Sequence, residues 1–140
     1  MHKIILSLAI CAIFPFAIVP AWALDPTQPP GSNFDLSHWY LQLPTINGVL
    51  TGASGNVDTF SPEQLTAGAT NAYFYTGPDG AKTFWAPDDG STTSGSTHPR
   101  SELREELIPD NVNTNWTLYG THIMTASCVV SNVPSAWEMT

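Results

Sequence analysis

The feature that most constrains the fold of this chain is a succession of short apolar runs separated by turns. Residues 72–76 (AYFYT) and 82–86 (KTFWA) are rich in aromatic residues, and residues 77–80 (GPDG) separate them at the distance of a hairpin. In residues 39–43, Trp and Leu alternate with Tyr and Gln until Pro44 stops the run. Aromatic and β-branched residues suit a pleated surface, while Pro, Asp and Gly preset turn angles. These patterns predict strands and tight turns.

No segment after Phe34 sustains a helical period. Residues 61–65 (SPEQL) predict a single helical turn, with Ser61 as its cap and Pro62 at its first position. Residues 116–130 alternate with period two, and their mostly apolar face includes His122 and Cys128. This predicts a long antiparallel strand that covers a core, with His122 and Cys128 buried. The fold class that follows is all-β, an antiparallel β-sandwich or jelly roll.

The N-terminus has the pattern of a secretory signal peptide. Lys3 precedes a nearly unbroken apolar run, and residues 21–23 (AWA) place small residues at the positions of a cleavage site. The alternative is a membrane-spanning helix, since the run nearly reaches the ~20 residues that a bilayer needs. Pro15 and Pro20, together with the small residues at positions 21 and 23, favour the signal peptide. We therefore expect residues 1–23 to be removed on export to the extracellular space or periplasm. Residues 24–33 are expected to be a lead-in that is mobile or lies on the surface, and residues 34–140 to form the N-terminal portion of a β-domain.

The charge balance excludes several kinds of partner. The chain has four Lys and Arg against twelve Asp and Glu, and a formal net charge of −8. Non-specific binding to nucleic acid or to an anionic membrane is not expected with that balance. After removal of residues 1–23 only Cys128 remains, so we expect no internal disulfide and a core that depends on packing. We expect a monomer.

Two of the four cations gather in residues 98–109 (HPRSELREELIP). As a strand, this segment places Arg100, Glu102, Arg104 and Glu106 on one face, spaced about 7 Å apart by two residues of rise. The other face holds Ser101, Glu105 and two leucines, and we expect both Leu103 and Leu107 to point into the core.

This charged row has two interpretations. The first is a solvated surface row, in which neighbouring opposite charges stabilise the protein by only about 0–1 kcal/mol. In a chain of ordinary composition this interpretation would be the favoured one. The scarcity of cations elsewhere favours recognition instead. Arginines that are held by carboxylates on a rigid strand suit the two-point binding of another carboxylate. The segment therefore predicts a localised site for an acidic ligand.

The same residues resemble a known family. Residues 84–87 (FWAP), the Gly/Ser/Thr-rich loop after them and residues 98–105 (HPRSELRE) are similar to the first signature of the family 7 alginate lyases. Residues 34–44 (FDLSHWYLQLP) resemble the start of the same domain. The resemblance covers roughly residues 34–130. It implies a concanavalin A-like β-jelly roll whose concave sheet holds alginate, and cleavage of uronic-acid links by β-elimination.

The resemblance also implies roles for individual residues. Arg100 would neutralise the substrate carboxylate while the neighbouring carbon is deprotonated, which is where preorganised charge helps most. Arg104 and Glu102 would support Arg100 or contact the adjacent sugar. Independently of the resemblance, the position of His98 two residues before Arg100 makes it a candidate to reach the same groove. Two further signatures of the family, a Gln-Ile-His strand and a strand with Tyr and Lys, do not occur in this sequence. We therefore expect the chain to be a partial jelly roll that lacks the base and the acid/base strands and is not active by itself.

Other candidates have simpler interpretations. His98 can also be a loop histidine that packs near Pro99. His38 has no partner that the sequence identifies, and residues 88–90 (DDG) are read as a turn rather than a calcium loop. The cysteine and the histidines lack zinc spacing, so we expect no metal or other cofactor. A non-catalytic, lectin-like sandwich that recognises acidic polysaccharide, and a structural domain with a solvated charge row, are the alternatives to a secreted lyase.

Overall fold

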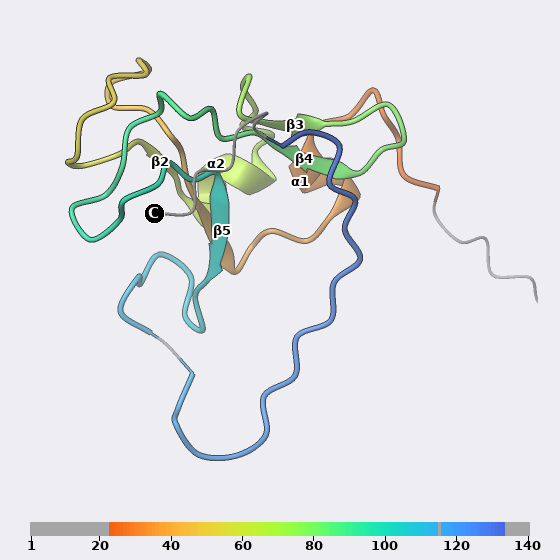
Figure 1. Ribbon diagram of the computed structural model, residues 1–140. Helices are drawn as coiled ribbons and strands as arrows, with labels where there is room; N and C mark the ends of the chain where they lie inside the picture. Colours follow the sequence, from red (N-terminus) through yellow and green to blue (C-terminus); the bar gives the residue numbers. More distant parts are fainter. Residues whose placement is uncertain (1–22, 115, 134–140) are drawn as a thin grey trace, which may run out of the picture.

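The computed structural model describes residues 23–114 and 116–133, so the predicted signal peptide, except for Ala23, lies outside the described residues. The elements are short and mostly extended (Figure 1). In chain order they are α1 (Pro30–Asn33), β1 (Trp39–Gln42), β2 (Thr59–Phe60), α2 (Pro62–Thr66), β3 (Phe74–Thr76), β4 (Lys82–Phe84) and β5 (Glu102–Glu105).

The strands form two antiparallel sheets within the described residues. In the first sheet the order is β2-β1-β5, so β1 lies in the centre. The second sheet is the predicted hairpin β3–β4, whose register pairs Phe74 with Phe84 and Thr76 with Lys82. The hairpin is confirmed by the structure, with both strands two residues shorter than the apolar runs that predict them.

One apolar core joins the two sheets. Leu41 of β1, Leu65 of α2 and Phe74 of β3 are fully buried in the same cluster as Leu36 and Leu43. Partly buried side chains pack around that cluster, among them Phe60 of β2 and Leu103 of β5. Each of the two sheets thus contributes to one shared core, which is the arrangement of a β-sandwich. The all-β, antiparallel class predicted from the sequence is confirmed, with three strands in one sheet and two in the other.

The predicted helical turn at residues 61–65 is confirmed as α2. The Ser61 side chain accepts from the backbone N–H of Gln64 at 3.2 Å, and the Gln64 side chain accepts from the Ser61 N–H at 2.9 Å. This reciprocal capping box satisfies two donors at the helix start, and Pro62 occupies a position where no N–H is needed. Leu65 then lies on the side of the helix that enters the core.

The lead-in, residues 24–33, lies against the β3–β4 hairpin. The Asn33 side chain donates to the Gly80 carbonyl at 3.3 Å and to the Asp25 carbonyl at 2.8 Å, and Thr76 donates to the Gln28 carbonyl at 2.6 Å. Next to this segment, the Lys82 ammonium lies 4.3 Å from the centre of the Phe34 ring, and burial lowers the pKa of Lys82. The turn of the hairpin is therefore tied to residues 24–33.

Replacing Gly80 by alanine tests this attachment. Gly80 has φ +80°, and an added Cβ would overlap the Cβ of Leu24. Strain and overlap together are expected to lower the free energy of unfolding by about 1–3 kcal/mol, measured by denaturant unfolding followed through tryptophan fluorescence. Gly95→Ala is the control, because a Cβ there meets no atom within 4 Å. Equal stabilities of the two variants would contradict the attachment.

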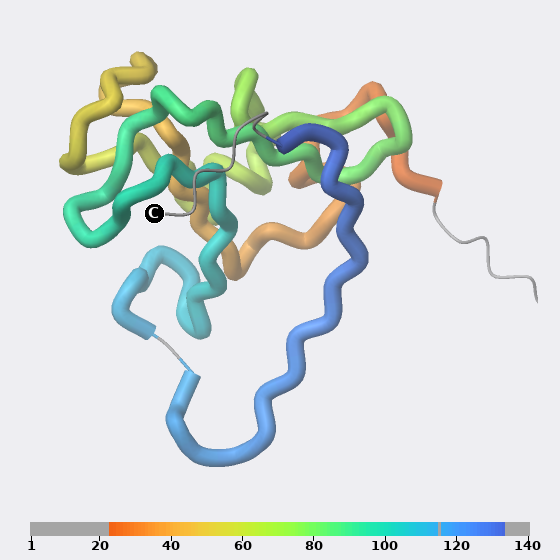
Figure 2. The backbone as a smooth tube through the Cα atoms, viewed as in Figure 1, coloured from red at the N-terminus to blue at the C-terminus, as the bar shows by residue number. Residues whose placement is uncertain are grey.

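The long strand predicted for residues 116–130 is wrong. The described residues from Trp116 onwards form no strand, and residues 116–133 are exposed throughout. Figure 2 shows this segment in blue, leaving the body after β5 and returning towards the β3–β4 hairpin. There, residues 129–132 and the exposed aromatic side chains Tyr75, Phe84 and Trp85 line a cavity of about 430 Å³.

The physical reason is that period-two alternation gives a side-chain pattern but supplies no backbone partner, and a strand is stable only when its N–H and C=O groups are paired. The burial predicted for Cys128 and His122 fails with the strand, since both residues are exposed. His122 instead donates to the carbonyl of Thr117 at 2.9 Å.

Among the residues that the structure describes, no helix is both long and apolar enough to cross a bilayer.

Candidate functional site

The pairing of β1 with β5 creates a polar face on the first sheet. In this ladder Leu41 lies opposite Leu103, and both belong to the core side. Because successive side chains of a strand point to opposite sides, the neighbours of these leucines lie on the other side. We call this side the polar face; its residues are Tyr40, Gln42, Thr59, Arg100, Glu102 and Arg104.

The carboxylate of Glu102 holds both arginines of the polar face. One carboxylate oxygen lies 3.3 Å from Nη1 of Arg100, and the other lies 3.7 Å from Nε of Arg104. The two arginine side chains are 52% and 50% exposed and that of Glu102 is 37% exposed. Ion pairs this exposed contribute little to stability. Their effect is to orient the guanidinium groups, and among the residues that the structure describes the other N–H donors of both arginines remain available to a ligand.

Arg104 has a second contact on the polar face. Its guanidinium carbon lies 5.9 Å from the centre of the Tyr40 ring, which is its cross-strand partner in the register. A cation over an aromatic face is attracted by the ring quadrupole. Arg104 is therefore fixed from two sides, by a carboxylate within its own strand and by an aromatic ring on β1.

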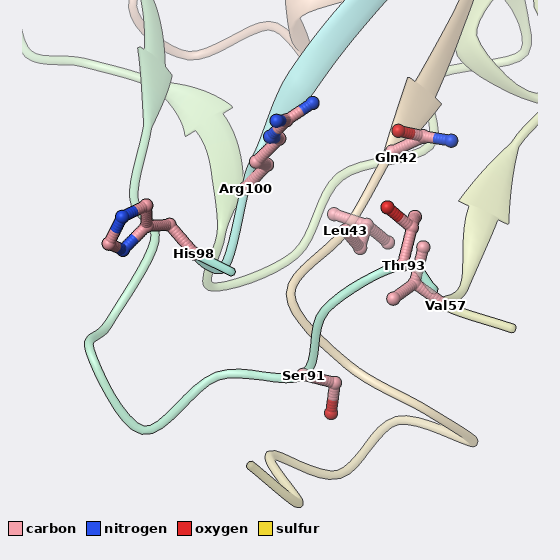
Figure 3. Close-up of a pocket in the computed structure, with 7 residues that line it drawn as sticks. All are labelled: Gln42, Leu43, Val57, Ser91, Thr93, His98 and Arg100. Carbon is pink, nitrogen blue, oxygen red and sulfur yellow. The ribbon is translucent and has the colours of Figure 1, made fainter. Parts of the chain in front are cut away.

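Arg100 borders a small hollow (Figure 3). The hollow has a volume of about 10 Å³, which is roughly the space of one water molecule. In Figure 3 the guanidinium of Arg100 and the amide of Gln42 stand on the same side of the sheet, with the hydroxyl of Thr93 below Gln42. The lining residues are Gln42, Leu43, Val57, Ser91, Thr93, His98 and Arg100.

The loop that precedes Arg100 is positioned by close packing. Gly90 lies between Pro44 and Pro99, and a Cβ on Gly90 would come within 2.7 Å of Pro99 and 3.0 Å of Pro44. Directly after Arg100, the Ser101 hydroxyl donates to the carbonyl of Tyr73 at 2.7 Å. These contacts fix the start of β5 against the core and the second sheet, and so place Arg100 at the edge of the hollow.

The four residues that the sequence singles out for this site lie near one another, though not equally. Arg100, Glu102 and Arg104 share the polar face as predicted from the alternation. His98 lines the hollow together with Arg100, but its side chain is exposed and Figure 3 shows the ring pointing away from the hollow. Its nearest contacts are local, with its backbone N–H donating to the Ser96 hydroxyl at 3.2 Å.

The alternation predicted for residues 100–107 fails beyond Glu105, where β5 ends. Glu106 was expected on the charged face but is buried, with its backbone N–H donating to the carbonyl of His38 at 2.7 Å. Leu107 was expected in the core but is exposed. The reason is that side chains alternate only while the backbone stays extended and paired, and the chain bends after Glu105. In the described part of the chain, Oε2 of Glu106 has no hydrogen-bond partner.

Sequence reasoning did not assign Gln42 and Tyr40 to the site. The alternation in residues 39–43 placed them together on one face, but it did not show which strand lies beside them. The register now pairs Gln42 with Glu102 and Tyr40 with Arg104. This pairing joins segments about sixty residues apart, and no local pattern encodes it.

A metal centre is not formed by the described residues. Within residues 23–114 and 116–133, no group of three or more His, Cys, Asp or Glu side chains is arranged to hold an ion. Asp88 and Asp89 lie in a turn, with the Gly90 N–H donating to the carbonyl of Pro87 at 3.1 Å. His38, for which the sequence identified no partner, donates from Nδ1 to the Glu106 carbonyl at 3.1 Å.

Comparison with known proteins connects this geometry to a family. The family described as alginate lyase matches residues 34–139. An alginate lyase of Klebsiella pneumoniae is 41% identical over 91 residues, which are 64% of this chain and 28% of that protein. The crystal structure of alginate lyase A1-II', a member of polysaccharide lyase family 7, is similar with 53% identity and a TM-score of 0.54, over 62% of this chain and 34% of that one. A variant of A1-II' in complex with substrate (GGMG) is similar with 52% identity and a TM-score of 0.56, over 65% of this chain and 35% of that one. The chain thus spans about a third of the length of the relatives it matches.

Proposed function

This chain belongs to the alginate lyase family, and we propose on that premise that its polar face binds a polyuronate and serves β-elimination. The single observation that carries the proposal is the exposed pair Arg100 and Arg104, both oriented by Glu102 on a chain whose net charge is −8. A protein this acidic repels polyanions over most of its surface. A local pair of fixed cations therefore selects where a uronate can approach.

The proposed chemistry begins with the proton next to the sugar carboxylate. Removing this proton places a second negative charge on the carboxylate, so the carbon is a very weak acid. A guanidinium that binds the carboxylate in two-point geometry stabilises the developing charge. We assign this role to Arg100, and we assign contacts with the same or the adjacent sugar to Arg104, Glu102 and His98. A base takes the proton from C5, the bond between C4 and the leaving oxygen breaks as the C4–C5 double bond forms, and an acid gives a proton to that oxygen. We assign neither the base nor the acid to a residue of this sequence.

The proposal extends to export and assembly. Residues 1–23 would direct the chain out of the cell, and Leu24 would be the first residue of the exported form. In support, Lys3, the apolar run after it and the small residues within 21–23 have the pattern of an export signal. The acidic composition supports a protein that does not bind nucleic acid or an anionic membrane, and we propose a monomer.

Alginate itself tests the proposed function. The chain is mixed with alginate, and ultraviolet absorbance is followed, because each β-elimination creates an unsaturated uronic end. The chain by itself is expected to retard alginate on a gel, reversibly with salt, and to give no rise in absorbance, because the base and acid/base strands do not occur in this sequence. A rise in absorbance that scales with protein concentration is expected from a form of the chain that is joined to those two strands. Salt-reversible retardation of alginate without a rise in that joined form would instead indicate the non-catalytic, lectin-like alternative. If no rise in absorbance and no retardation of alginate are observed, both the lyase proposal and the lectin-like alternative are contradicted.

A further inference from the structure

The geometry points to Gln42 as a further residue that contacts the substrate, by binding a ring hydroxyl of the uronate whose carboxylate Arg100 engages. This inference rests on the proposed function and adds a contact that orients the sugar. Gln42 lies on β1, the central strand of its sheet, with Glu102 opposite on β5 and Thr59 opposite on β2. A central strand is a rigid support, so the position of the amide is well defined.

The burial of the two residues that flank Gln42 determines the side of the sheet to which its side chain points. Its neighbours Leu41 and Leu43 are almost completely buried in the core, at 0% and 3% exposure. Gln42 therefore projects to the polar face, where its side chain is half-buried and borders the hollow. In Figure 3 the amide stands across the hollow from the Arg100 guanidinium, with the amide oxygen on the Arg100 side.

The size of the hollow limits what can occupy it. A volume of about 10 Å³ admits one water-sized group and excludes a pyranose ring. A uronate bound to Arg100 must therefore lie over the hollow and reach in with a single substituent. A hydroxyl group fits this description. Its neighbours would be the Gln42 amide on one side and Arg100 on the other.

The chemistry of the face favours a hydroxyl at Gln42 over a second carboxylate. A guanidinium only donates hydrogen bonds and an ionised carboxylate only accepts them, whereas an amide does both. A sugar hydroxyl also donates and accepts, so Gln42 complements it in either direction. Arg100 fixes the carboxylate, and a second contact at Gln42 would stop the ring from turning about that anchor. This is how a neutral contact would raise the fraction of productively bound substrate.

Titration of the chain with a short oligouronate tests this contact. Loss of one neutral hydrogen bond in Gln42→Ala is expected to weaken binding about 10-fold. This loss should stay the same when salt is raised, because no charge is removed. Gln42→Glu keeps the shape of the side chain and adds a negative charge, so this variant should bind the oligouronate more weakly than Gln42→Ala does. The additional loss of affinity should become smaller as the salt concentration is raised, because salt screens the repulsion between the new carboxylate and the uronate. A purely structural role would not produce this difference in salt dependence.

Gln64→Glu is the matched control. It makes the same substitution on α2, on the core side of the sheet, and glutamate at this position preserves the capping box. Its affinity for the oligouronate is expected to equal that of the unchanged chain. If Gln42→Ala does not fold, Gln42→Thr replaces it, since threonine suits a strand and is too short to reach the hollow.

The outcomes separate the two proposals. If the unchanged chain binds the oligouronate and both Gln42→Ala and Gln42→Thr bind within two-fold of it, the role of Gln42 is overturned and the proposed function stands. If the unchanged chain binds no oligouronate, the proposed function fails and the inference fails with it. A loss in Gln42→Ala that disappears at high salt would show a carboxylate contact and overturn the assignment to a hydroxyl.

Discussion

Replacing Arg100 by alanine is expected to weaken binding of an oligouronate about 10- to 100-fold. This is the factor that corresponds to losing charge-assisted hydrogen bonds of ~1.5–3 kcal/mol. In a form of the chain that is joined to strands supplying the base and the acid, turnover of alginate, measured as ultraviolet absorbance, should fall further, by about 10²- to 10³-fold, because the guanidinium would act on charge that develops in the transition state. Arg100→Lys should recover only part of either loss, since an ammonium cannot bind a carboxylate in two-point geometry.

The control for Arg100 is Lys82→Met. It also removes one positive charge, but at a residue of β4 that lies over the Phe34 ring, and methionine keeps the apolar stem in place. Binding should change little in this variant. If Arg100→Ala and Lys82→Met lose affinity equally, the effect is one of net charge, and the assignment of Arg100 to the site is wrong. Circular dichroism of each variant checks that the fold is retained.

Replacing Asp58 by alanine is expected to lower the free energy of unfolding by about 3 kcal/mol. One carboxylate oxygen accepts from the Thr45 hydroxyl at 2.7 Å and from the Gly48 N–H at 2.7 Å, and the other accepts from the Asn47 N–H at 2.9 Å. Thr45 is buried, and Asn47 and Gly48 both have positive φ in the tight turn between Ile46 and Val49. Removing the carboxylate leaves three donors without their acceptor. Denaturant unfolding measures the loss.

The same carboxylate predicts a dependence of stability on pH. Partial burial raises the pKa of Asp58, but the hydrogen bonds from Thr45, Gly48 and Asn47 outweigh it and hold the pKa below its ordinary value of 3.8. Because the folded-state pKa is depressed, the stabilisation is present above about pH 4 and is lost as pH falls through the folded-state value. In Asp58→Asn the free energy of unfolding should therefore depend less on pH below about pH 4. An equally steep loss of stability at low pH in Asp58→Asn would contradict this assignment.

Local features of the fold were predictable because local chemistry determines them. The capping box of Ser61 and Gln64, the turn at residues 77–80 and the alternation in residues 39–43 each depend on residues a few positions apart. The same holds for the arginine row, where the residues that form the ion pairs are two apart. For this reason Arg100, Glu102 and Arg104 could be placed on one face before the structure was known.

The remaining features depend on partners that are distant in the sequence. The register of β1 and β5 brings Gln42 to Glu102, and it is determined by the shared core rather than by either strand alone. The burial of Glu106 depends on where β5 ends, which alternation does not indicate. Residues 116–130 have the pattern of a strand, but no pairing in the described chain completes it. Pattern predicts which side chains can share a face, and long-range packing decides whether they do.

The carboxylate of Glu102 has a consequence for both arginines of the polar face. Since each of its oxygens faces a different guanidinium, any shift of this one side chain changes the geometry of both cations together. Arg100 and Arg104 are therefore energetically coupled rather than additive in their contributions. A polymer that carries one charge on each repeating unit would therefore bind the two arginines as one cooperative site. The strand fixes the spacing of these arginines in the free protein.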